Sequence, residues 1–266
     1  MGGGIAYKAF EPISENERCV WTIRAGIVKG FTLNVLNIGI SNSTTDTQVI
    51  ASCLRHQAGP TYFLLNQTGS VNGVGGCDVL VITLASGRDV GNSSGFVLEY
   101  SVLRNSTLSL ESQDYIIKAE EAAIIRYPSP ALEYTNFEFT TFTILPNLGS
   151  KTNVIYFRNS LEGTTCLDNL RIYRFNASSE VPTKWQYDGI ICGQIPSNVI
   201  INDDLILITF NSDISRVGSG FELAVVTSAA SECHMFRNLF KFIDNAVRKF
   251  SHFIFGRQID SNSQKW

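Results

Sequence analysis

The sequence has few of the residues that zinc sites and covalent mechanisms need. Only three of its 266 residues are His, and its six Cys form no Cys-x-x-Cys pair, so a structural zinc site is not expected. Neither a Gly-x-Ser-x-Gly elbow nor a His-Glu-x-x-His motif occurs. The glycine-rich GVGG at 73–76 leads into a strand-like run, whereas a phosphate loop opens a helix. These absences indicate a protein that is not an enzyme.

Long apolar runs and a basic stripe are also missing. No run approaches the length of a membrane span. The start, MGGGIAYKAF, lacks the basic and apolar regions of a signal peptide, so we expect either a cytosolic protein or a truncated N-terminus. With 21 basic and 24 acidic residues, the chain lacks the positive charge that phosphate neutralisation needs. Nucleic acid is therefore not an expected partner.

The C-terminal segment, 228–266, differs from the rest. From Glu232 onward it has six Lys or Arg and three acids, a local charge of +3, which leaves 15 bases and 21 acids elsewhere. Its apolar residues recur every three or four positions, which predicts an amphipathic helix with a basic face. Such a helix either docks on a core or lies on a partner or membrane surface. Membrane contact is expected only through this helix.

Short runs rich in Val, Ile, Phe and Thr make up most of the remaining chain. Several alternate apolar and polar residues, as in Phe31, Leu33 and Val35, which is the period of a half-buried strand. The expected strands are 19–23, 31–40, 78–84, 96–102, 141–145, 168–175, 204–210 and 221–226. The sequence therefore predicts an all-β fold.

An internal repeat divides these strands into two sets. DVLVITLASGRDVGNSSGFVLEY (78–100) matches DLILITFNSDISRVGSGFELAV (204–225), and CVWTI (19–23) matches TTFTI (140–144). Two copies of roughly 100 residues fit two β-sandwich domains in tandem. We expect domain 1 at 2–103, a linker at 104–119, domain 2 at 120–227 and the helical tail at 228–266.

Cysteine and sequon content favours the secretory route. Disulfides are a better interpretation of the six Cys than metal ligation. Sequons of the form Asn-x-Ser/Thr are weak evidence singly, but they agree with disulfides in favouring a secreted glycoprotein. The candidate glycosylation sites are Asn42, Asn66, Asn92, Asn105 and Asn176.

Several motifs of the second copy resemble the CUB domain, an extracellular, jelly-roll-like β-sandwich. CLDNLRI (166–172) is similar to the family's Cys-x-x-Asp-x-x-x-Ile strand, and ICGQIPSN (191–198) to its Cys-Gly followed by Pro. FNSD (210–213) and GFEL (220–223) resemble its Phe-x-Ser-Asp loop and closing strand. The first copy, with GGGIAYKAF before CVWTI, is more divergent. The resemblance implies two CUB-type domains over 2–227 and leaves the tail unexplained.

The resemblance also implies disulfides. Cys166 would pair with Cys192, and Cys53 with Cys77, each closing a loop of about 25 residues that is worth about 3 kcal/mol. Cys19 matches the second Cys of the family's first bridge, whose partner would precede Gly2. The alternative is that Cys19 pairs with Cys233 or is not bridged.

Three acids match the calcium ligands of many CUB domains. They are Glu162, Asp168 and Asp213, and carboxylates are the ligands that an extracellular Ca²⁺ site gathers. The alternative is that Asp213 only forms a turn and the other two are surface charges. In the first copy Gly87 replaces Asp213, and Asp46 stands at the strand position. We therefore expect Ca²⁺ in domain 2 but not in domain 1.

Such a calcium site implies calcium-dependent recognition of a partner. An acidic, ordered pocket suits a Lys or Arg of an extracellular protein, and a glycan is the other possible ligand. We expect Glu162 and Asp213 to contact the partner, with hydrogen bonds from Asn211, Ser212 and Ser215. Two alternative functions remain: the regulatory part of a larger secreted protease, or a membrane-surface protein acting through its basic helix.

Overall fold

The computed structural model confirms the all-β fold class. It describes residues 2–24, 30–40, 47–103, 113–119, 122–128, 132–146, 150–162, 165–176, 185–193, 201–203 and 205–229. These residues form β-strands and one 3₁₀ helix, η1 (Val74–Gly76). No helix among them has the length and hydrophobicity needed to cross a membrane. The expected helix in the C-terminal tail lies outside the described residues.

The first β-sandwich consists of two four-stranded antiparallel sheets. In hydrogen-bonding order, sheet A contains β1 (Gly2–Pro12), β8 (Ser94–Val102), β3 (Phe31–Ile38) and β6 (Gly69–Ser70). Sheet B contains β2 (Arg18–Arg24), β7 (Val79–Ala85), β4 (Gln48–Leu54) and β5 (Thr61–Leu64). Strand β3 explains the alternation of apolar and polar residues in the sequence. Phe31, Leu33 and Val35 are buried in the core between the sheets, and the residues between them are more exposed.

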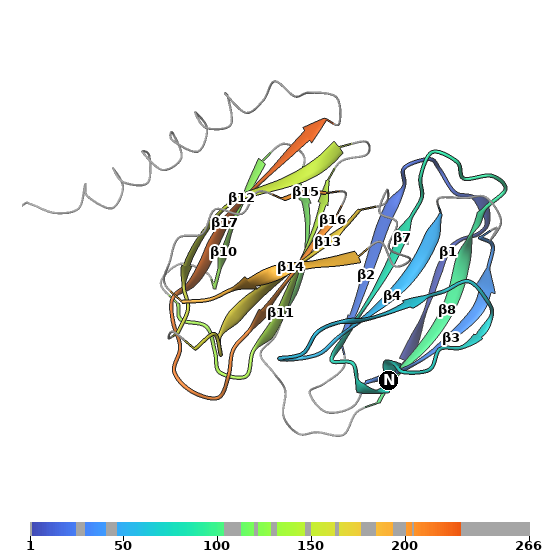
Figure 1. Cartoon of the computed structure of the whole chain (residues 1–266). Coiled ribbons are helices and arrows are strands. Elements are labelled where there is room, and N and C mark those ends of the chain that lie inside the picture. Colours follow the sequence, from blue (N-terminus) through green and yellow to red (C-terminus); the bar gives the residue numbers. More distant parts are fainter. Residues whose placement is uncertain are drawn as a thin grey trace, which may run out of the picture. The chain divides into compact units, whose positions relative to one another are not determined.

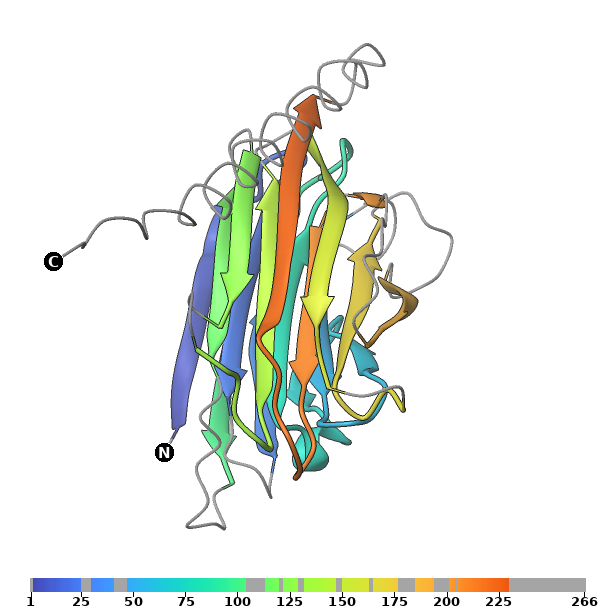
Figure 2. The same ribbon diagram turned by 90° about the vertical axis from the view of Figure 1, so that its left-hand side faces the viewer.

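The second sandwich has the same two-sheet plan (Figure 1). Sheet C contains β14 (Trp185–Ile191), β13 (Asn169–Phe175), β16 (Leu205–Asn211), β11 (Phe139–Pro146) and β9 (Asp114–Ala119). Sheet D contains β10 (Ala122–Tyr127), β17 (Gly220–Ala229), β12 (Ser150–Ser160) and β15 (Ile201–Asp203). In Figure 2 most strands lie close to the vertical, with their arrows pointing both up and down. Strand β9 pairs in parallel with β11, so the second sandwich begins inside the segment expected to be a linker.

A third apolar layer joins sheets B and C. All seven residues of β7 and all seven of β16 are buried, because each strand is covered on both faces. Leu80 and Ile82 of β7 point into the core of the first sandwich, whereas Val79 and Val81 belong to the layer shared with sheet C. From sheet C, this interlayer core receives Phe139, Tyr173, Phe175, Trp185, Leu205 and Leu207. Nearly continuous apolar runs, such as VLVITLA in β7 and LILITFN in β16, are typical of strands buried on both sides.

Polar and aromatic contacts border the interlayer core. The guanidinium of Arg24 donates to both carboxylate oxygens of Asp114, at 2.8 and 2.5 Å, and it lies 5.8 Å from the ring centre of Phe139. The rings of Tyr62 and Trp185 stack with their planes 6° apart. These pairs each join one sandwich to the other. The two sandwiches are therefore packed against each other through both apolar and charged groups.

Both expected disulfides are present, Cys53–Cys77 and Cys166–Cys192. They do not occupy equivalent positions in the repeat. Strands β4 and β13 are equivalent, since Gln48 pairs with Ala85 as Asn169 pairs with Asn211. Cys53 lies near the end of β4, whereas Cys166 precedes β13. Cys233 lies outside the described residues, and the Sγ of Cys19 lies 3.9 Å from Glu17 Oε1.

Leu207 tests the interlayer core. It is 1% exposed, so Leu207→Ala should lower the free energy of unfolding by about 2–5 kcal/mol, the usual loss for a buried Leu. Leu36→Ala is the matched control, because Leu36 is 46% exposed on β3, and it should cost less than about 1 kcal/mol. Chemical denaturation measures both. Equal losses would show that Leu207 is not packed between the sheets.

The disulfides are tested by peptide mapping without reduction. In protein made by secretion, we expect the Cys53–Cys77 and Cys166–Cys192 links, and reduction should destabilise the fold by about 3 kcal/mol for each bridge. Four unmodified thiols at these positions would contradict the assignment.

Candidate functional site

Strand pairing brings two of the three predicted acids together. Asp168 immediately precedes β13 and Asp213 follows β16, and these antiparallel neighbours pair Asn169 with Asn211. The start of one strand therefore lies beside the end of the other. Glu162 joins them from the loop after β12, so that one carboxylate oxygen of each acid lies within 4.8 Å of the others. The structure thus brings together all three residues predicted as calcium ligands.

Tyr134 holds this acidic cluster in place, and the sequence reasoning missed it. Its hydroxyl donates to Asp168 Oδ2 at 2.5 Å and accepts the backbone N–H of Glu162 at 2.9 Å. The N–H of Asp213 donates to the other oxygen of Asp168 at 2.8 Å. Asp168 is fully buried, and its two oxygens tie the other two acids to it. Tyr134 and Asp168 are therefore the fixed centre of the cluster.

Within the described residues, the negative charge of the cluster is only partly compensated. Burial raises the pKa of Asp168, and the nearby charge of Asp213 raises it further, while the two hydrogen bonds act in the opposite direction. Glu162 Oε2 is buried without a hydrogen-bond partner. Arg216 Nε lies 3.6 Å from Glu162 Oε1, but that side chain is 80% exposed. Three carboxylates and one guanidinium leave a formal charge of −2 when all are ionised.

Two of the predicted partner-binding residues are in the wrong place for that role. Asn211 and Ser212 are 1% and 0% exposed. The Ser212 hydroxyl donates to Thr135 O and accepts from the N–H of Glu138, so it holds loops together instead of meeting a partner. Of the three residues expected to hydrogen-bond the partner, Ser215 alone is exposed. Its N–H donates to Asp213 Oδ1 at 2.8 Å. Short polar residues at a loop cannot be assigned to surface or interior from sequence alone.

The first sandwich keeps the loop framework but not the acids. Its Ser86 accepts from the N–H of Glu17 and donates to Ser14 O, as Ser212 does with Glu138 and Thr135. This equivalence places three residues of the first sandwich where Tyr134, Asp168 and Asp213 stand: Ile13, Thr47 and Gly87. The strand position is therefore Thr47 and not Asp46, which itself lies outside the described residues. An alignment of the two copies sets Tyr134 against Ile13, and this difference is the signal in the sequence that could have pointed to Tyr134.

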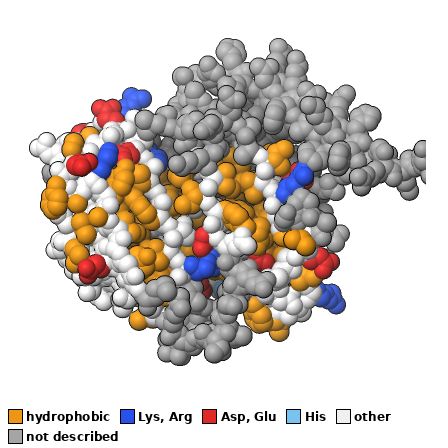
Figure 3. All heavy atoms as spheres, turned by 180° about the vertical axis from the view of Figure 1, so that it is seen from behind, with side chains coloured by type: hydrophobic (Ala, Val, Ile, Leu, Met, Phe, Trp, Pro, Cys, Tyr) orange, Lys and Arg blue, Asp and Glu red, His pale blue; other side chains and the backbone are white. Residues whose placement is uncertain are grey.

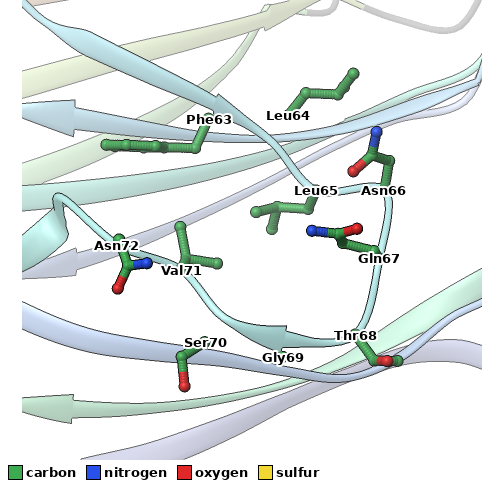
Figure 4. A pocket seen from close by; sticks show the side chains of 10 residues that line it. All are labelled: Phe63, Leu64, Leu65, Asn66, Gln67, Thr68, Gly69, Ser70, Val71 and Asn72. Atoms are coloured by element: carbon green, nitrogen blue, oxygen red, sulfur yellow. The ribbon is translucent and has the colours of Figure 1, made fainter.

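Of the three predicted glycosylation sites that the structure describes, two are exposed. Asn66 and Asn92 lie on the surface, whereas Asn176 is half-buried. Asn42 and Asn105 lie outside the described residues. Asn66 also borders a hollow of about 310 Å³ formed by residues 63–72. Leu65, Gln67 and Val71 point into the space that this loop encloses (Figure 4). None of the residues that line the hollow is titratable.

The two β-sandwiches, with one disulfide in each and the acidic cluster in the second, agree with the resemblance to the CUB domain. Two solved structures similar to this chain are the CUB1-EGF-CUB2 domain of human MASP-1/3 and the CUB1-EGF-CUB2 domains of rat MASP-1. Each is 15% identical; they cover 86% and 85% of this chain and 100% and 97% of their own, with TM-scores of 0.37 and 0.34. No family model and no curated protein matches the chain.

The raised pKa of Asp168 gives a pH dependence of defined sign. The folded protein retains this proton to a higher pH than the unfolded chain does, so stability should fall as pH rises from the ordinary value of 3.8 through the raised pKa. Asp168→Asn removes the titrating group and should flatten the plot of unfolding free energy against pH in this range. Asp89→Asn, at an exposed position, should leave the plot unchanged. Unfolding free energies from about pH 4 to pH 7 in chelator provide the measurement. Parallel curves for wild type and Asp168→Asn would contradict this account.

Proposed function

We propose that this protein is a non-catalytic extracellular binding module that recognises a basic protein partner through a calcium-ordered acidic site in its second sandwich. The observation that carries the proposal is the convergence of Glu162, Asp168 and Asp213 within 4.8 Å. Like charges at that separation repel one another, and partial burial increases the cost. A bound divalent cation would offset this repulsion.

The chemistry of the site fits Ca²⁺. All three donors are carboxylates, and Ca²⁺ prefers oxygen ligands in a flexible arrangement that waters can complete. Glu162 Oε2, buried without a hydrogen bond, is an acceptor that a cation would satisfy. Calcium would supply positive charge and loop order, while Tyr134 and the N–H of Asp213 orient Asp168 toward it.

A protein partner is favoured by apolar side chains next to the acids. Leu167 is 50% exposed and directly precedes Asp168, and Ile214 is 64% exposed and directly follows Asp213. Phe137, 49% exposed, donates its N–H to Asp213 O at 2.6 Å. Exposed apolar side chains also occur elsewhere, scattered among charged ones on the face seen in Figure 3. Those beside the acidic cluster would contact the partner around its Lys or Arg.

An extracellular location is supported by the covalent features of the chain. Two disulfides within the described residues are expected in an oxidising compartment. The sequons at Asn66 and Asn92 are exposed and so accessible for glycosylation. The same location would supply calcium at the concentrations that weak extracellular sites require, with Kd of about 10⁻⁴ to 10⁻³ M.

Calcium titration of Asp213→Ala tests the site. In wild type, calcium at about 100 times Kd should stabilise the fold by about 2.7 kcal/mol, and Asp213→Ala should lose this gain. The matched control is Asp89→Ala, because Asp89 lies in the equivalent loop of the first sandwich, is exposed and, within the described residues, accepts one local N–H, that of Gly91 at 3.1 Å. That variant should respond to calcium as wild type does. Equal stabilisation of Asp213→Ala and wild type would refute the site.

Binding of a lysine-rich protein tests the proposed partner chemistry. Immobilised wild type should retain cationised albumin in calcium and release it in chelator, and acetylation of the albumin lysines should abolish retention. Asp213→Ala should retain at least tenfold less, while Asp89→Ala, which removes the same charge, should not change retention. Equal loss in both variants would mean that net charge alone causes the retention.

A further inference from the structure

A turn of the first sandwich contacts both loops that carry the acids of the second. Residues 55–58, here named the clamp turn, follow β4. The Nε2 of His56 lies 2.9 Å from Ser212 O, and because a carbonyl only accepts, this nitrogen is the donor. Gln57 Nε2 donates to Leu167 O at 3.0 Å. Ser212 directly precedes Asp213, and Leu167 directly precedes Asp168.

Further hydrogen bonds connect the clamp turn to the strand ends. The backbone N–H of Gln57 donates to Asn211 Oδ1 at 3.2 Å. The side-chain amide of Asn169 donates to Leu167 O at 3.0 Å and lies 3.4 Å from Gln57 Oε1. Asn169 and Asn211 are the paired residues at which β13 starts and β16 ends. The clamp turn therefore bridges the two segments whose separation sets the spacing of Asp168 and Asp213.

The clamp turn is itself held firmly by the first sandwich. The Cys53–Cys77 disulfide lies beside it, and Asp78 Oδ2 accepts the N–H of His56 at 2.7 Å. Arg55 Nε donates to Gly76 O at 3.2 Å. Gln57 has φ of +58°, a conformation that costs energy for a residue other than glycine and persists where its surroundings hold it. The turn is thus a rigid support.

We propose that His56 and Gln57 are positioning residues for the acidic site: the first sandwich, which lacks the acids, fixes the separation of Asp168 and Asp213 in the second. The two side chains bind the carbonyls of Ser212 and Leu167, and each carbonyl belongs to the residue directly before an acid. Preorganised ligands bind a cation more tightly because less order must be gained on binding. The effect on calcium affinity rests on the proposed function, whereas the support that His56 and Gln57 give to the two loops does not.

This arrangement couples calcium binding to the packing of the two sandwiches, so that each strengthens the other. If the clamp turn raises the affinity of the acidic site for calcium, bound calcium must strengthen the contact of the clamp turn by the same factor. The arrangement also explains how the two copies of the repeat divide their roles. One copy presents the carboxylates, and the other copy supplies the turn that spaces them.

Amide exchange in metal-free protein tests the proposal without depending on calcium. The clamp variant combines His56→Ala and Gln57→Ala. The N–H groups of Asp213 and Ser215, which donate to Asp168 and Asp213, should exchange about tenfold faster in it than in wild type. Arg24→Gln is the control, because it removes a different polar link between the sandwiches, and Arg24 makes no hydrogen bond to the clamp turn within the described residues. It should leave both amides unchanged.

Calcium titration of the same variants supplies the second readout. The clamp variant should bind calcium about tenfold more weakly, a typical coupling between sites, whereas Arg24→Gln should match wild type. His56→Gln retains a side-chain N–H donor, so with Gln57 intact its amide exchange and calcium affinity should lie closer to wild type than those of His56→Ala. Such a rescue would not be expected if His56 only filled space.

The outcomes separate this inference from the proposed function. Unchanged exchange at Asp213 and Ser215 in the clamp variant would overturn the inference. Absence of calcium binding by wild type would overturn the proposed function, and exchange would still decide the inference. If the clamp variant does not fold, Gln57→Ala alone, which keeps His56 and the backbone, is compared with Arg24→Gln by the same criteria.

Discussion

The apolar layer between sheets B and C is the constraint on which the rest of the structure depends. It converts two sandwiches with separate cores into one body, because β7 and β16 contribute side chains to their own core and to the shared layer. Hydrophobic contact of this kind is not directional. The Arg24–Asp114 pair and the contacts of the clamp turn, residues 55–58, supply the direction and register. The acidic site thereby acquires supports from a second domain.

The two copies of the repeat share a framework and differ in chemistry. In each, a Ser hydroxyl after the central strand binds the start of the neighbouring strand, through Glu17 in one copy and Glu138 in the other. Only the second copy adds Tyr134, Asp168 and Asp213 to this framework. A buried carboxylate is tolerable there because it receives hydrogen bonds from a hydroxyl and a backbone N–H. The same loop framework therefore occurs with the acids in one copy and without them in the other.

Local patterns made much of this predictable. Alternation identified β3, the repeat identified the two sandwiches, and the resemblance to the CUB domain identified both disulfides and all three acids of the cluster. Features that depend on tertiary contacts were missed. The fully buried β7 and β16 carried a signal, a nearly continuous apolar run interrupted by Thr83 in one strand and by Thr209 in the other, which indicates cover on both faces. The burial of Asn211 and Ser212 and the pairing of β9 with β11 had no such signal, since each depends on distant residues.

Calorimetric unfolding at increasing calcium concentration tests most directly the claim that the two sandwiches form one body supporting a calcium site. A shared core and a shared clamp require the sandwiches to unfold together. The account therefore predicts one transition, with equal calorimetric and van't Hoff enthalpies, that moves as a whole to higher temperature as calcium is added. Two transitions, of which calcium moves only one, would contradict it.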